Sequence, residues 1–229
     1  MKRQRSKKGK LIVIEGTDGS GKTTQFKLLI KRLKEEGFKT SSMSFPRHNT
    51  PFFGLLIDRY LNNEFGKADE VSPYLASVLY AADRWEVRDK LMHSLKLGKI
   101  VVLDRYVESN LGHQGGKIQD VSKRKKLLKW LGDLDYKVFK NPKPDLVIYL
   151  SVPSKFSVRL AGKLSKKYKK TSYDGLENIG HLTKARKVFE ALASSKQYWK
   201  KINCVERGKL FPILEIHEKV WEYVRKIIS

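Results

Sequence analysis

Short apolar runs and amphipathic stretches alternate along the chain. Residues 11–14, 100–103 and 146–150 are apolar at every position, which predicts strands. We expect the strands at 100–103 and 146–150 to be buried on both faces. The stretches 39–45 and 201–205 predict two more strands. Helical periodicity marks one segment that closes before Gly37 and others near 52–62, 73–97, 122–139, 154–169, 181–199 and 213–228. Five strands that alternate with helices predict an α/β fold with a central parallel sheet.

A glycine-rich segment joins the first predicted strand to the first predicted helix. Residues 16–23 read GTDGSGKT and fit the pattern G-x-x-x-x-G-K-[ST], the phosphate-binding P-loop. Its backbone N–H groups can surround phosphates, Lys22 can reach the β and γ oxygens, and the Thr23 hydroxyl can hold Mg²⁺. The predicted ATP-binding residues are Gly16, Thr17, Asp18, Gly19, Ser20, Gly21, Lys22, Thr23 and Thr24. The alternative is a turn that only links strand to helix.

Composition and charge limit the domain organisation, the cellular compartment and the kind of partner that we expect. The chain has 229 residues, for which we expect a basic tail at 1–10 and one domain at 11–229. A single cysteine, Cys204, excludes an internal disulfide, and no apolar run approaches the roughly 18 residues of a membrane span. We therefore expect a cytoplasmic protein without membrane contact. The net charge of +24 favours anionic partners.

The same charge leaves a second class of function open, a nucleic-acid-binding ATPase or scaffold. Basic runs occur at 2–10 and 123–126, in the predicted tail and on a predicted helix. No ladder of base-stacking aromatic residues accompanies them, so we expect at most weak, non-specific contact with nucleic acid.

Three motifs beyond the P-loop carry a family resemblance. Phe45-Pro46-Arg47 follows the second strand, Leu79 to Glu86 reads LYAADRWE on a long helix, and Asp104-Arg105-Tyr106 ends the third strand. In order and spacing, the motifs of nearly the whole chain after residue 10 resemble those of thymidylate kinases. The resemblance implies a three-layer P-loop NTPase fold with a mobile lid at about 159–177. It also implies a homodimer that uses ATP and Mg²⁺ to convert dTMP into dTDP, a step in dTTP synthesis.

The resemblance also assigns roles to individual residues. The implied dTMP-binding set is Asp18, Arg47, Tyr80, Arg84, Arg105, Ser109, Asn110, Gln114 and Tyr173. Within it, Asp18 meets the 3′-hydroxyl and Arg47 clamps the acceptor phosphate, as a bidentate guanidinium can. Tyr80 and Arg84 lie four residues apart, share a helix face and hold the base. Taken alone, Tyr80 is more often a core aromatic residue and Arg84 a surface cation.

The implied catalytic residues are Lys22, Arg105, Asp18 and Arg159, and the implied metal residues are Thr23 and Asp104. For Asp104, a structural ion pair is the alternative. Some thymidylate kinases carry an arginine within the P-loop where this chain has Gly19, and others supply lid arginines. Here the lid offers Arg159 near its start and then only lysines. Arg159 is the first candidate for the transition-state cation, with Lys163, Lys166 and Lys167 as alternatives. The nearest competing function is a kinase for another deoxynucleotide or a nucleoside.

Overall fold

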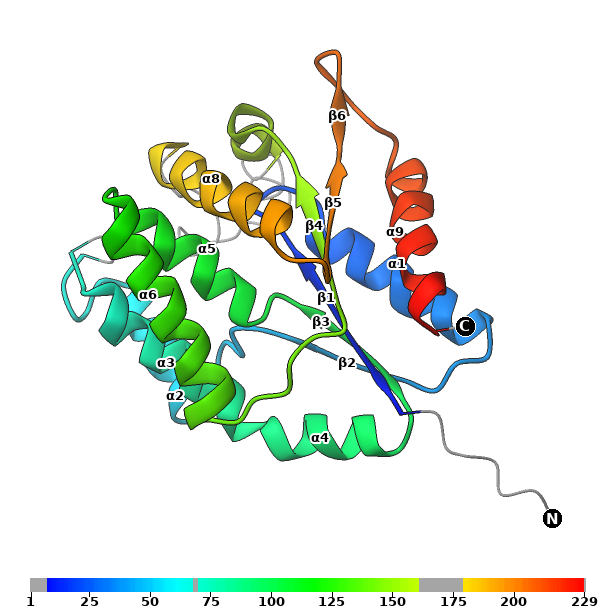
Figure 1. Ribbon diagram of the computed structural model, residues 1–229, viewed down its shortest axis with the longest axis horizontal. Helices are drawn as coiled ribbons and strands as arrows, with labels where there is room; N and C mark the ends of the chain where they lie inside the picture. Colours follow the sequence, from blue (N-terminus) through cyan, green and yellow to red (C-terminus); the bar gives the residue numbers. More distant parts are fainter. Residues whose placement is uncertain (1–7, 68–69, 161–178, 229) are drawn as a thin grey trace.

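The computed structural model describes residues 8–67, 70–160 and 179–228 (Figure 1). Its centre is a five-stranded parallel sheet in the order β2-β3-β1-β4-β5. The strands are β1 Lys10–Glu15, β2 Thr40–Ser44, β3 Ile100–Asp104, β4 Leu146–Ser151 and β5 Trp199–Asn203. The predicted α/β fold with a central five-stranded parallel sheet is confirmed.

Helices cover both faces of this sheet and make three layers (Figure 1). One outer layer holds α1 Lys22–Glu35 and α9 Ile213–Ile228, which pack against each other. The other holds α4 Arg88–Lys96, α5 Val107–Lys117, α6 Val121–Asp133 and α8 Ile179–Ser195, with α2 Phe53–Leu61 and α3 Pro73–Glu86 beyond α5. The binding edge of such a sheet is the one where parallel strands end, beside the loop between β1 and α1.

The apolar strands divide their side chains between two cores. On β1, Leu11 and Val13 pack with α5, α6 and α8, whereas Ile12 and Ile14 pack with α1 and α9. All four side chains are 0% exposed, because successive side chains of a strand point to opposite faces and both faces are covered. The prediction of strands buried on both faces is confirmed for β3 and β4, and β1 is buried in the same way from Leu11 onward.

The helix predicted over 73–97 is wrong as one element. It divides at Val87 into α3 and α4. The segment predicted as one helix near 122–139 is α6 followed by a π-helical turn, Leu134–Val138. A hairpin of β6 Val205–Glu206 and β7 Lys209–Leu210 follows β5 and was not predicted.

Helix α5 has no counterpart among the predicted helices, because three glycines weaken its apolar periodicity. Those glycines lie where α5 crosses α8. A Cβ at Gly112 would lie 2.2 Å from the Phe189 ring, and one at Gly116 would lie 2.9 Å from the Ala185 nitrogen. The glycines therefore let the two helices approach closely, and α5 is held rigidly against α8.

Two predicted segments reach the limits of the described chain. Strand β1 begins at Lys10, inside the stretch that we assigned to a basic tail, and residues 1–7 lie outside the described residues. Residues 154–160 are helical, while 161–178, most of the predicted lid, lie outside the described residues. In the described part of the chain, no helix has the length and apolar character needed to cross a membrane.

Candidate active site

The loop between β1 and α1 has the backbone that a phosphate cradle requires. Gly21 has φ +87°, a conformation that a side chain would strain. At Gly16 a Cβ would lie 2.4 Å from the Ser20 hydroxyl oxygen, so only glycine fits. The predicted residues Gly16 to Thr24 form this loop and the first turn of α1. The N-terminus of α1 supplies partial positive charge at the same place.

Lys22 lies inside the loop that it terminates. Its side chain is buried, and Nζ donates a hydrogen bond to the Thr17 carbonyl oxygen at 2.8 Å. The same nitrogen lies 3.6 Å from Oδ1 of Asp18. Burial lowers the pKa of the Lys22 ammonium, and the nearby positive charge of Arg105 lowers it further. The cradle therefore contains a poorly solvated cation, for which phosphate oxygens would be the strongest partners.

Thr23 and Asp104 meet at this edge of the sheet, as predicted for the metal residues. Thr23 Oγ1 donates to Oδ2 of Asp104 at 2.8 Å, and the buried Oδ1 has no hydrogen-bond partner among the described residues. Hydroxyl and carboxylate oxygens are the ligands that Mg²⁺ prefers, and this ion needs only one or two protein oxygens beside phosphates and water. The pair fits Mg²⁺. Within the described ranges, no cluster of three or more His, Cys, Asp or Glu side chains offers a closed protein cage.

Arg105 is held by several partners in an unusual backbone conformation. Its φ is +65°, which is uncommon for a residue other than glycine and persists where the surroundings enforce it. Nη2 donates to Oδ1 of Asp18, and Nη1 lies 3.3 Å from the Ser109 hydroxyl and 3.1 Å from Nε2 of His113. The structure thus brings together Asp18, Arg105 and Ser109, three of the predicted dTMP-binding residues.

Two buried acids, which we did not predict as site residues, lie beneath this cluster. Glu15 accepts hydrogen bonds from the Tyr106 backbone N–H at 2.8 Å and from the Ser109 hydroxyl at 2.8 Å. Burial raises the pKa of Glu15, and the positive charge of Arg105 opposes that rise. Glu108 accepts from the Tyr136 hydroxyl at 3.0 Å. The signal available in the sequence was a charged residue at the end of an apolar run, LIVIE, which is costly unless it is paired.

Glu108 gives a prediction for stability. Burial, together with the charge of Glu15, raises its pKa from the usual 4.5 to about 7, so the folded protein holds a proton there that the unfolded chain releases. Because the pKa is higher in the folded protein, the contribution of this carboxyl group to stability is lost as the pH rises from about 4.5 through about 7. We expect this group to lower the free energy of unfolding of the wild type by about 3 kcal/mol between about pH 5 and about pH 8. Glu108→Gln should lack this contribution.

Urea denaturation at the two pH values measures the effect as the difference between the wild type and the variant. Glu222→Gln, at an exposed carboxyl group on α9, is the matched control and should leave the pH dependence unchanged. An equal pH dependence in the wild type and in Glu108→Gln would contradict the assignment.

Arg84 is a buried residue and not the surface cation that its residue type alone would suggest. The side chain is 2% exposed, and Nε and Nη2 each donate to a carboxylate oxygen of Asp135 at 2.9 Å. Asn141 also donates to Asp135 at 2.9 Å. Asp135 was not predicted, because it lies in the π-helical turn that the sequence pattern gave as ordinary helix. The buried pair fixes the Arg84 guanidinium, and its contact with a base stays a prediction.

The other predicted acceptor residues lie on α3, on α5 and in the segment after β2. Arg47 Nε donates to Asp83 at 2.8 Å, and its Nη2 donates to Glu86. Tyr80 makes an edge contact with Tyr60, with ring centroids 6.2 Å apart. The roles of these residues toward a ligand stay predictions.

Helix α5 carries two amides of the predicted acceptor set. Asn110 Nδ2 donates to the Ser77 carbonyl oxygen at 3.3 Å. Gln114 is 4% exposed, and its buried Oε1 has no hydrogen-bond partner among the described residues. Such an acceptor is costly unless a ligand or water satisfies it. The role of Gln114 toward a ligand stays a prediction.

Two predicted residues lie at or beyond the edge of the described chain. Arg159 is exposed, and its guanidinium lies over the Phe156 ring at 5.3 Å. The structure does not bring it into contact with the cradle residues named above, so its catalytic role stays a prediction. Tyr173 lies outside the described residues, as do Lys163, Lys166 and Lys167.

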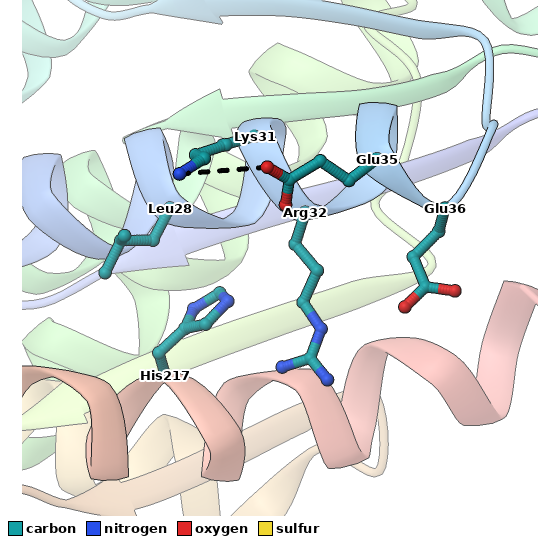
Figure 2. A pocket seen from close by; sticks show the side chains of 6 residues that line it. All are labelled: Leu28, Lys31, Arg32, Glu35, Glu36 and His217. Carbon is teal, nitrogen blue, oxygen red and sulfur yellow. Dashed lines mark ion pairs between the residues drawn. The ribbon is translucent and has the colours of Figure 1, made fainter.

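A second hollow lies between α1 and α9 (Figure 2). Its walls are Leu28, Lys31, Arg32, Glu35, Glu36 and His217. Lys31 pairs with Glu35 along α1, and Arg32 donates to Glu218 of α9 at 2.7 Å. None of the predicted site residues borders it, and three of its charged side chains, Lys31, Arg32 and Glu35, are already paired across or along the helices. We therefore place the active site at the P-loop and not here.

Comparison with known proteins identifies the family of this chain. The family model described as thymidylate kinase matches residues 14–219. A thymidylate kinase of Plasmodium falciparum is 30% identical over 221 residues, which cover 96% of this chain and 92% of that protein. A thymidylate kinase of Dictyostelium discoideum is 30% identical over 199 residues, which cover 86% of this chain and 78% of that protein. The solved structure of a Candida albicans thymidylate kinase aligns with a TM-score of 0.74 at 25% identity. The alignment covers 96% of this chain and 92% of that structure. The chain belongs to the thymidylate kinase family.

Proposed function

We propose that this protein transfers the γ-phosphoryl group of ATP to the phosphate of dTMP and so forms ADP and dTDP, a step in dTTP synthesis. One observation carries the proposal: at the mouth of a P-loop, Asp18 contacts both Lys22 and Arg105, and Thr23 donates a hydrogen bond to Asp104 at the same edge of the sheet. This cluster joins a site for donor phosphates to a site for a second, acceptor phosphate. Family membership then names the acceptor as dTMP.

The proposed chemistry needs alignment and charge neutralisation more than proton removal. An oxygen of the dTMP phosphate forms a bond to the γ-phosphorus, and the bond from the γ-phosphorus to the bridging oxygen of ADP breaks. Lys22 neutralises charge on the donor oxygens, and Arg105 spans the acceptor phosphate and the transferring group. Thr23 and Asp104 would hold Mg²⁺, which when bound supplies further positive charge to the β and γ oxygens.

Recognition of the acceptor falls to the residues around α3 and α5. We assign Gln114 to the base, because its amide can satisfy a donor and an acceptor edge of thymine and its buried Oε1 has no partner among the described residues. Asp18 is assigned to the 3′-hydroxyl, Arg47 to the acceptor phosphate, and Tyr80 with Arg84 to the base. Arg159 is assigned to the transferring phosphoryl group, from a lid that closes over both nucleotides and excludes water.

The setting of the reaction is also a proposal. A single cysteine, buried at Cys204, fits a reducing cytoplasm. The net charge of +24 suits phosphate-bearing substrates and permits weak, salt-sensitive contact with nucleic acid.

Product analysis tests the reaction. Phosphorus NMR of the purified protein with Mg-ATP and dTMP should show ADP and dTDP appearing in equal amounts while ATP and dTMP fall. Omission of dTMP should leave ATP intact. ATP hydrolysis to ADP and inorganic phosphate without dTDP would refute the proposal and favour an ATPase of another class.

We also propose that the protein is a homodimer that pairs through α3. Leu75, Val78 and Trp85 are 68%, 37% and 46% exposed and recur along this helix, and Leu55 of α2 is 48% exposed beside it. Helix α3 lies on the side of the molecule away from α9 (Figure 1). An exposed apolar stripe of this kind is costly in water unless a second surface covers it.

Sedimentation equilibrium tests this pairing. We expect about twice the chain mass of 26.5 kDa for the wild type and the single-chain mass for Leu75→Glu. Leu97→Glu, at an exposed leucine beyond α4, is the control and should stay dimeric. A wild type of single-chain mass at micromolar concentration would exclude the proposal.

A further inference from the structure

Two histidines from different helices lie behind the arginine of the active site. His113 is on α5, and His181 is on the first turn of α8, directly after the undescribed segment 161–178. Their rings are nearly parallel, with 16° between the planes and 5.5 Å between centroids, and Nδ1 of His113 lies 3.2 Å from Nε2 of His181. The other ring nitrogen of His113, Nε2, lies 3.1 Å from Nη1 of Arg105.

Arg105 determines which nitrogen donates and which accepts in the series of hydrogen bonds that joins Arg105, His113 and His181. A guanidinium only donates hydrogen bonds, so Nε2 of His113 must be the acceptor and must carry no proton. The proton of neutral His113 then lies on Nδ1 and is donated to Nε2 of His181. The order is Arg105 Nη1–H to His113, then His113 Nδ1–H to His181. Each imidazole is in this way fixed in one tautomer by its neighbour.

The surroundings of His113 favour this neutral state. The ionisable groups that face it are Arg105, Asp18 of the P-loop, His181 of α8 and Lys22 of α1. Burial lowers the pKa of His113 well below its usual 6.5, and the charge of Arg105 lowers it further, while Asp18 acts in the opposite direction. A charged His113 would have no lone pair for Arg105, so the geometry and the charge state agree.

We propose that His181 is a positioning residue of the kinase: acting through His113, it holds the guanidinium of Arg105 in the orientation that receives the acceptor phosphate. This inference rests on the proposed function and extends it to a residue outside the predicted site. Helix α8 is a suitable anchor, because α5 and α8 are locked together at Gly112 and Gly116. The chain therefore ties the clamp on the acceptor to the helix that follows the predicted lid.

Kinetics of His181 variants test the proposal. His181→Phe keeps a ring for stacking but removes the acceptor nitrogen, whereas His181→Gln keeps an acceptor at similar reach. We expect the Phe variant to raise KM for dTMP about tenfold, the worth of one hydrogen bond to a charged system, with KM for ATP unchanged. The Gln variant should stay within about twofold of the wild type. His93→Phe, at an exposed histidine on α4, is the control.

A second readout does not depend on activity. Nitrogen-15 NMR of the imidazole rings at neutral pH should show His113 neutral with its proton on Nδ1. A wild-type KM for dTMP in His181→Phe, equal rises in KM for both substrates, or a proton on Nε2 of His113 would each overturn the proposal. If the wild type forms no dTDP, the proposed function fails, while the tautomer of His113 still decides whether the hydrogen-bonded chain exists.

Discussion

Replacing Lys22 with methionine should lower kcat for dTDP formation about a thousandfold. Methionine keeps the length and the apolar stem of lysine but removes the one buried cation inside the phosphate cradle. That cation interacts most strongly with the transferring group, because few water molecules screen it. Binding of dTMP, measured by calorimetry without ATP, should change little, since the acceptor clamp is assigned to Arg105 and Arg47.

Lys27→Met is the matched control for this variant. Lys27 lies on the same helix, α1, but its side chain is exposed and no part of the cradle involves it. We expect its kcat to equal that of the wild type. A Lys22→Met enzyme that retains more than about a tenth of the wild-type kcat would contradict the role assigned to the P-loop lysine.

Arg105→Ala should lower kcat/KM for dTMP by about three orders of magnitude. The guanidinium is the group that can span acceptor and transferring phosphates, and Asp18, Ser109 and His113 hold it in place. Arg105→Lys should restore only a small part of the activity, because an ammonium group cannot donate two parallel hydrogen bonds. Initial rates at varied dTMP and saturating ATP measure both variants.

Arg207→Ala serves as the control for loss of one positive charge. Arg207 is exposed in the hairpin of β6 and β7, which contains none of the predicted site residues. Its removal should leave kcat/KM within about twofold of the wild type. Full rescue of activity by Arg105→Lys would contradict bidentate contact with phosphate and would reduce the role of Arg105 to that of a point charge.

The fold was predictable because its signals are local. Three apolar runs predicted β1, β3 and β4, and the glycine pattern between β1 and α1 predicted the cradle, since only certain backbone conformations bring several N–H groups to one point. Helix α5 escaped prediction because its three glycines serve the crossing with α8 and not a continuous apolar stripe. A helix defined by what it touches cannot be recognised from its own periodicity.

The placement of Lys22, Thr23 and Asp104 at one edge of the sheet was predictable, because each of these residues sits at a strand end or in a motif. The contacts of the site were not predictable where the partner is distant in sequence. Asp135 meets Arg84 across 51 positions, and His181 meets His113 across 68. Such pairs carry no local signature, because each side chain alone is compatible with an ordinary helix surface. The support beneath the motif residues therefore came only from the structure.

The most direct test of the account is a comparison of acceptors. We would measure kcat/KM for ADP formation at saturating Mg-ATP with dTMP, dUMP, dCMP, dGMP and AMP. We expect dTMP to be the best acceptor, ahead of dUMP by about tenfold, which is what one buried methyl group contributes. A higher kcat/KM for another monophosphate would contradict the assignment of the base pocket to thymine, and no turnover with any of them would contradict the kinase itself.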